Sequence, residues 1–171
     1  EDITKMAAMS PSEKSYFETS VLAHAKHRIA WLLILMFSAT ITGTIITRYE
    51  NAFAAIPLLV SFIPMLMDTG GNCGSQSSTL IIRGIALGEI QFSDLFRVMF
   101  KEFRVSLIVG VALALANGIR ILIMYKNAGL ALVIGLSLVA TIVISKLIGC
   151  VLPLIAKKLH MDPAIMASPL I

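Results

Sequence analysis

The sequence predicts an all-α integral membrane domain. Of its 171 residues, 57% are apolar and 14% are charged, and the mean hydropathy is +0.89. Soluble domains carry about 25% charged residues, so this chain has too few charges to cover itself in water. Apolar stretches long enough to cross a bilayer as helices, about 18 residues or more, recur along the chain. We therefore expect several membrane-spanning helices.

Five apolar segments are candidate spans. They cover residues 29–47, 52–82, 105–124, 130–155 and 164–171. The second segment is interrupted by Pro57, Pro64 and a group of glycines. The last follows the helix-breaking pair Asp162-Pro163, and we expect the sequence to stop inside that helix after a turn or two. The architecture predicted for one subunit is five transmembrane helices, the fifth of them truncated.

The amino-terminal residues, 1–28, are polar and mixed in charge. Tyr16, Phe17, Val21 and Leu22 recur at helical spacing, which predicts a juxtamembrane amphipathic helix ahead of a transmembrane domain at 29–171. A disordered tail is the alternative.

Lys and Arg predict the orientation, because basic loops stay on the cytoplasmic side of a membrane. With the amino terminus inside, ten of the 14 Lys and Arg residues are cytoplasmic, three are outside and Lys146 lies within a span. The inner ones are Lys5, Lys14, Lys26, Arg28, Arg83, Arg97, Lys101, Arg104, Lys157 and Lys158, and the outer ones are Arg48, Arg120 and Lys126. We expect a multi-pass protein of the cytoplasmic membrane. Charges spread over several loops also argue against nucleic acid as a partner.

A polar cluster in the second span is the strongest functional signal. The segment from Pro64 to Gln76 contains an aspartate, an asparagine, a glutamine and several glycines. At about 100° per residue, one sector of a helix holds Asp68, Asn72, Ser75, Gln76, Thr79 and Arg83. Polar groups are costly in a bilayer, so such a sector marks a pathway or binding site, with helix packing as the alternative.

The glycines Gly70, Gly71 and Gly74 lie beside or behind this polar sector. Small residues let another helix approach closely, and they would free backbone carbonyls if the helix unwound at the glycine pair. Carboxylate, amide and hydroxyl oxygens without thiolate or imidazole clusters suit hard cations such as Mg2+, Mn2+ or Ca2+. Because Mg2+ releases water reluctantly, a site for it would hold a largely hydrated ion in a wide polar throat.

One motif carries a resemblance to a known family. Pro64, followed after five residues by Gly70-Gly71-Asn72-x-Gly74-x-Gln76, resembles the signature of the MgtE family of magnesium channels. The order of the spans, Arg83, Asp162-Pro163-Ala164 and Ser168-Pro169-Leu170 support it. The resemblance implies a homodimer with five transmembrane helices per subunit and a pore on the dimer axis, between the second and fifth helices.

The resemblance also implies roles for particular residues. It assigns Gly70, Gly71, Asn72 and Gln76 to the pore lining, and it places an essential aspartate on the fifth helix, beyond the last residue of this sequence. Ser168, near the entry to that helix, is a further candidate. Residues 1–28 resemble the family's plug helix, while the family's cytosolic Mg2+-sensing domains are absent from this sequence.

The function expected from these observations is inward movement of largely hydrated Mg2+ through a selective pore. A secondary transporter of another divalent cation could instead use Asp68 as an ion or proton site, although we find no second copy of the polar cluster. A non-transporting subunit, in which small residues serve packing alone, is the other alternative. We expect no enzyme, because the spans contain no histidine and no nucleophile with a base.

The other polar residues of the spans are weaker candidates for function. Asp68 is the only acidic residue within a complete predicted span, and Lys146 is expected to extend its ammonium group toward the inner interface. Thr141, Ser145 and Gly149 share one helix face and indicate contact with another helix, as do Asn117 and Gly118. Cys73 and Cys150 are expected to be free, buried thiols.

Overall fold

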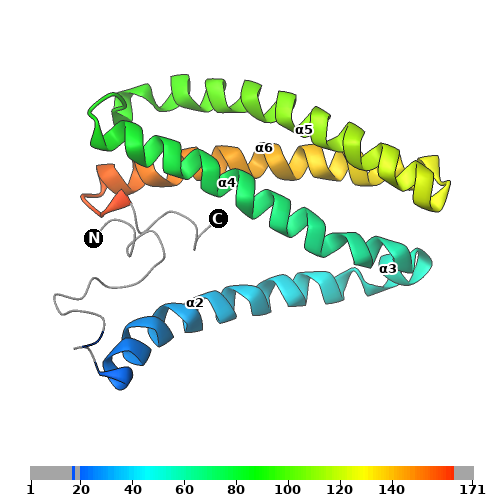
Figure 1. Ribbon diagram of the computed structural model, residues 1–171, viewed down its shortest axis with the longest axis horizontal. Helices are drawn as coiled ribbons and strands as arrows, with labels where there is room; N and C mark the ends of the chain where they lie inside the picture. Colours follow the sequence, from blue (N-terminus) through cyan, green and yellow to red (C-terminus); the bar gives the residue numbers. More distant parts are fainter. Residues whose placement is uncertain (1–16, 18–19, 164–171) are drawn as a thin grey trace. The chain divides into compact units, whose positions relative to one another are not determined.

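The computed structural model describes residue 17 and residues 20–163, and these residues form helices joined by short connections, with no strand among them. The helices are α2 (Val21–Arg48), α3 (Glu50–Ala55), α4 (Ile63–Ala86), α5 (Leu95–Tyr125) and α6 (Ala128–Lys158), with 3-10 turns η1 (Pro57–Phe62) and η2 (Phe92–Asp94) (Figure 1). The chain divides into two compact units, residues 1–57 and 58–171.

The first unit is dominated by α2, whose first turn is capped by Ser20. The hydroxyl oxygen of Ser20 accepts a hydrogen bond from the Ala23 amide at 3.3 Å. Four threonines in the apolar part of α2 donate their hydroxyl protons to carbonyl oxygens one turn earlier, which satisfies them without water. They are Thr40, Thr42, Thr44 and Thr47. The expected first span, 29–47, lies within this helix.

The expected second span, 52–82, is divided into three pieces. Helix α3 ends at Ala55, Pro57 opens η1, and α4 begins only at Ile63. Pro64 lies in the first turn of α4, where a missing amide proton breaks no helical hydrogen bond. From there α4 is continuous through Gly70 and Gly71, so the helix does not unwind at the glycine pair.

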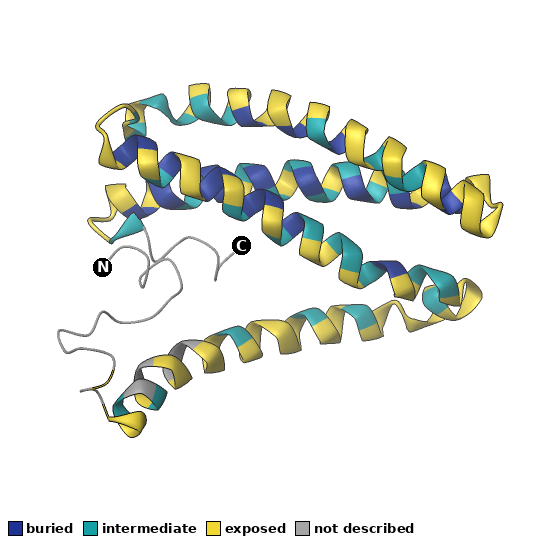
Figure 2. Cartoon of the chain, in the orientation of Figure 1, coloured by how far each residue is buried: buried dark blue, intermediate teal, exposed yellow. Residues whose placement is uncertain are grey.

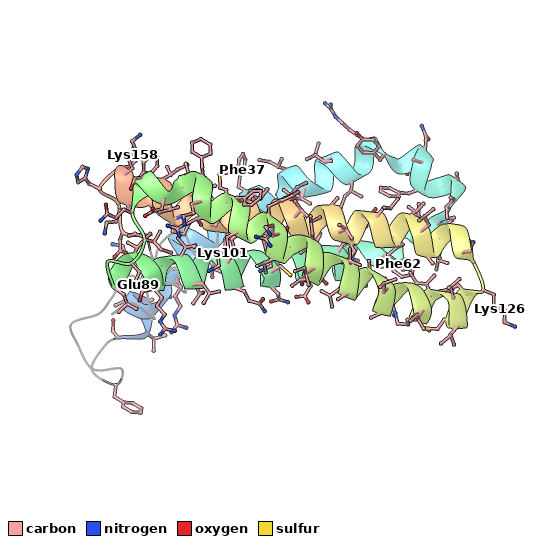
Figure 3. The ribbon with its side chains drawn as sticks, turned by 90° about the horizontal axis from the view of Figure 1, so that it is seen from above. Phe37, Phe62, Glu89, Lys101, Lys126 and Lys158 are labelled. Atoms are coloured by element: carbon pink, nitrogen blue, oxygen red, sulfur yellow. The ribbon has the colours of Figure 1, made fainter. Side chains whose placement is uncertain are left out.

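The second unit consists of α4, α5 and α6, and α6 packs along both of the others (Figure 1). Small apolar clusters hold the three helices together. One contains Phe62, Ile121, Leu130, Ala131 and Ile134, another Cys73, Leu138 and Ile142, and a third Ile81, Ile85, Cys150 and Leu154. The labelled Phe62 and Lys126 lie toward one end of this unit and Glu89 and Lys158 toward the other (Figure 3).

Two stretches of this unit are long and apolar enough to cross a membrane. They are Phe92–Tyr125 and Ala128–Lys158, with mean hydropathies of 2.2 and 2.4 in their most apolar windows. Much of α5 is exposed (Figure 2), including Ile108 at 73% and Ile123 at 73%. Apolar surface of this kind is costly in water and is stable against lipid. The fold is therefore that of an all-helical membrane domain.

Candidate functional site

Helix α4 presents one polar face that neither α5 nor α6 covers. Asp68, Asn72, Gln76, Thr79 and Arg83 are all exposed along it, as the helical periodicity predicts. Part of this face is hollowed into an open depression of about 710 Å³. Its lining residues are Asn72, Ser75, Gln76, Thr79 and Leu80. We call Asp68, Asn72, Ser75, Gln76 and Thr79 the polar face of α4.

Asn72 and Asp68 form a hydrogen-bonded pair within the polar face. The amide Nδ2 of Asn72 donates to Oδ2 of Asp68 at 3.1 Å, one helical turn away. Because the nitrogen of the amide is engaged in this way, the amide oxygen of Asn72 is left to act as an acceptor or ion ligand. A carboxylate and an amide oxygen are thus held close together on an exposed helix surface.

The predicted glycines of the site divide between two sides of α4. Gly70 and Gly74 are buried against α6: a Cβ on Gly70 would lie 2.8 Å from Cγ2 of Thr141 and 2.9 Å from Oγ of Ser145. Gly149 lies so close to the backbone of Gly74 that a Cβ added to Gly149 would be 2.9 Å from the carbonyl carbon of Gly74. The packing role predicted for Thr141, Ser145 and Gly149 is confirmed.

Gly71 differs from the two buried glycines, because a Cβ added there would meet nothing within 4 Å. It lies beside Asn72 on the accessible side of α4. Of the residues predicted for the site, the structure therefore brings Asp68, Gly71, Asn72, Ser75, Gln76 and Thr79 together and places Gly70 in the contact with α6. Ser168 lies outside the described residues.

The polar face offers oxygen ligands without a preformed metal cage. Among the described residues, no three His, Cys, Asp or Glu side chains gather to hold a metal ion. Mg2+ keeps several of its waters when it binds to proteins, and those waters donate hydrogen bonds to carboxylate, amide and hydroxyl oxygens. The exposed oxygens of this face are therefore acceptors of the kind that the water shell of a hydrated cation requires.

Behind α4 lies a buried charged network that the sequence pattern did not predict. Lys146 of α6 is only 5% exposed, and its Nζ lies 3.7 Å from Oε2 of Glu102 on α5. The prediction that Lys146 extends to the inner interface is wrong. Asp68 is also not the only acidic residue within a long apolar helix, because α5 begins at Leu95 and so includes Glu102. Glu102 lay just ahead of the predicted span 105–124.

The two cysteines of the chain are buried and free, as predicted. Cys73 packs with Leu138 and Ile142, and Cys150 packs with Ile81, Ile85 and Leu154. They contribute to the contacts between α4 and α6.

Apolar helices that expose much of their apolar surface, together with one helix whose exposed face is polar, define a helical membrane protein of the class that includes ion transporters. Residues 63–171 match the model of the MgtE family, described as divalent cation transporters. The chain belongs to the MgtE family.

Three curated relatives are each named magnesium transporter MgtE. The protein from Bacillus subtilis is 36% identical over 171 residues, and the one from Thermus thermophilus is 34% identical over 172 residues; each alignment covers 100% of this chain. The protein from Enterococcus faecalis is 30% identical over 150 residues, or 88% of this chain. The matched regions are 38%, 38% and 33% of the relatives' own lengths, so this chain spans less than two fifths of each.

Proposed function

We propose that this chain forms part of a Mg2+-conducting membrane domain in which the polar face of α4 lines the ion path. The observation that carries the proposal is the exposure of Asp68, Asn72, Gln76 and Thr79 on one side of a helix whose other side packs against apolar α6. Polar groups at membrane depth are stable where they meet water or an ion. The names of the relatives support Mg2+ as that ion.

The ion passes largely hydrated. A carboxylate from Asp68, amide oxygens from Asn72 and Gln76, and the hydroxyls of Ser75 and Thr79 accept hydrogen bonds from its water shell. Stripping Mg2+ of water is slow and costly, so contacts through water allow it to enter and leave rapidly. The negative charge of Asp68 attracts the cation, while the neutral groups bind too weakly to trap it.

A single helix face cannot enclose an ion, so the path needs further surfaces. In the proposed assembly two copies of the chain form a homodimer with the pore on its axis, and a fifth helix following residue 163 contributes to the wall. Mg2+ moves inward down its electrochemical gradient across the cytoplasmic membrane. The amino terminus is cytoplasmic, and residues 1–28 act as a plug-like juxtamembrane segment.

Mg2+ uptake into proteoliposomes containing the complete natural protein tests this function. The Gln76→Leu variant removes an amide from the polar face and should lose most of the uptake. The Thr44→Val variant is the control, because the Thr44 hydroxyl already donates to the Thr40 carbonyl within its own helix at 2.9 Å. It should retain native uptake. Absence of Mg2+ uptake by the folded native protein would contradict the proposal, as would native-like uptake by Gln76→Leu.

A further inference from the structure

Three helices of the second unit meet at a buried group of polar side chains. The Ser77 hydroxyl on α4 donates to Oε2 of Glu102 on α5 at 2.6 Å, and Nζ of Lys146 on α6 donates to the Ser77 oxygen at 3.2 Å. The exposed fractions of Ser77, Lys146 and Glu102 are 0%, 5% and 8%. A carboxylate and an ammonium group are thus paired between the three helices, with little exposure to solvent.

This group lies directly behind the polar face of α4. Ser77 follows Gln76 in the chain and points to the opposite, buried side of the same helix, so the two charges are separated from the polar face by about one helix diameter, roughly 10–12 Å. Charges act over such distances where apolar groups surround them, because the effective dielectric constant is lower than in water. A divalent ion experiences twice the effect of a monovalent one.

We propose that Glu102 and Lys146 form a charge-balancing pair that sets the Mg2+ affinity of the polar face of α4. This inference rests on the proposed function. The carboxylate alone would bind the passing cation more tightly, and the ammonium group alone would repel it. At a separation of 3.7 Å their fields largely cancel at the ion path, which leaves Asp68 as the negative charge that the ion meets.

Packing alone does not account for this pair. Buried ion pairs are often no more stabilising than apolar side chains of the same volume, and ionisable residues within a membrane domain are rare outside functional sites. The surrounding contacts between α4 and α6 already come from apolar and small residues such as Ile81, Gly74 and Gly149. The charges therefore have a role that apolar residues could not fill.

The inference predicts shifts of opposite sign for two nearly isosteric substitutions. Glu102→Gln leaves the positive charge of Lys146 unbalanced and raises the KM for Mg2+ uptake. Lys146→Met leaves the negative charge of Glu102 unbalanced and lowers that KM. At effective dielectric constants of about 20 to 80, a unit charge at this range changes the affinity for a divalent ion by between about fourfold and about 150-fold. We expect shifts of about tenfold in each direction.

Two further variants separate charge from structure. The double variant Glu102→Gln/Lys146→Met restores neutrality, so its KM should return close to the native value. Ser77→Ala removes the hydroxyl that links the helices without changing any charge, and its KM should also stay close to native. A purely structural network would instead impair all four variants in the same direction, chiefly through the maximal rate.

The decisive experiment measures the KM for Mg2+ uptake by the complete natural protein and these four variants in proteoliposomes. Opposite KM shifts for Glu102→Gln and Lys146→Met support the inference. Shifts in the same direction, or none, overturn it while leaving the proposed function intact. Absence of Mg2+ uptake by the native protein overturns both.

If either single variant fails to fold, the exchange variant Glu102→Lys/Lys146→Glu provides a second test. It retains one carboxylate and one ammonium group at the same pair of positions, so the inference predicts a KM close to native. A folded exchange variant whose KM differs from the native value by about tenfold or more would overturn the inference.

Discussion

Nδ2 of Asn72 donates a hydrogen bond to Oδ2 of Asp68 at 3.1 Å, and the pair faces outward from α4. This contact ties the one carboxylate of the polar face to the amide that follows it by one helical turn. It gives Asp68 two separable roles, as a negative charge for the cation and as the acceptor that orients Asn72.

Substitutions at Asp68 separate these two roles. Asp68→Asn keeps an acceptor for Asn72 but removes the charge, whereas Asp68→Ala removes both. Because the charge attracts the divalent ion directly, we expect Asp68→Asn to raise the KM for Mg2+ uptake by about tenfold or more, with a larger loss for Asp68→Ala. Concentration-dependent uptake in proteoliposomes measures both values. Native-like uptake by Asp68→Asn together with a loss in Asp68→Ala would show that orientation of Asn72 is the role that matters.

Neighbouring positions on α4 should differ in their access to water. Thr79 is exposed on the polar face, whereas Ser78 is fully buried at 0% exposure. In a protein whose Cys73 and Cys150 are replaced by alanine, we expect a charged, water-soluble thiosulfonate to label Thr79→Cys rapidly and Ser78→Cys slowly. Labelling is read out by mass spectrometry on protein in membranes. Equal rates at the two positions would mean that the polar face does not line a water-filled path.

Close packing of α4 on α6 should make Gly149 intolerant of a side chain. A Cβ at this position would clash with the carbonyl oxygen of Gly74, so Gly149→Ala must push the two helices apart. We expect it to lower the free energy of unfolding by about 1–3 kcal/mol. Gly118→Ala on α5 is the matched control, because a Cβ there meets nothing within 4 Å.

The control should be neutral or stabilising by up to about 1 kcal/mol, since alanine is favoured over glycine inside a helix. Unfolding in mixed detergent micelles, followed by circular dichroism, compares the two variants. Equal stability of Gly149→Ala and Gly118→Ala would contradict the close approach of α4 to α6.

Hydration of the passing ion predicts inhibition by an inert mimic. Cobalt hexammine resembles hexahydrated Mg2+ in size and cannot exchange its ligands. If the polar face binds the ion through its water shell, this complex should compete with Mg2+ for uptake. Competition is measured as a rise in the Mg2+ concentration needed for half-maximal uptake. Strong competition by Ca2+ with none by cobalt hexammine would indicate direct coordination instead.

The polar face and the packing face of α4 follow from helical periodicity alone. With about 100° between residues, Asp68, Asn72 and Gln76 must share one side, and Gly70 and Gly74 must turn away from it. The continuity of α4 through Gly70-Gly71 did not follow from the sequence, because glycine allows unwinding without requiring it. The information that keeps α4 helical here is the packing of Gly70 against α6, which no local sequence pattern shows.

The pairing of Glu102 with Lys146 could not be read from the sequence for a different reason. A lysine near the end of an apolar helix can reach the interface by its own length, and nothing in the local pattern shows that a carboxylate from another helix lies beside it. Glu102 also falls in the charged first turns of α5, where it resembles an ordinary interfacial residue. A span chosen by hydropathy therefore begins only after Glu102, at residue 105. Only the packing of the three helices brings these groups together.

The most direct test of the central claim, that the polar face of α4 lines a Mg2+ path, is Mg2+ uptake by Asn72→Ala compared with Asn117→Ala. Both variants remove an amide from a long helix, but Asn117 accepts a hydrogen bond from Arg120 at 3.0 Å on α5 and is not part of the polar face. With equal amounts of folded protein in proteoliposomes, Asn117→Ala should take up Mg2+ as the native protein does, and Asn72→Ala should lose most of its uptake. Native uptake by Asn72→Ala would contradict the claim.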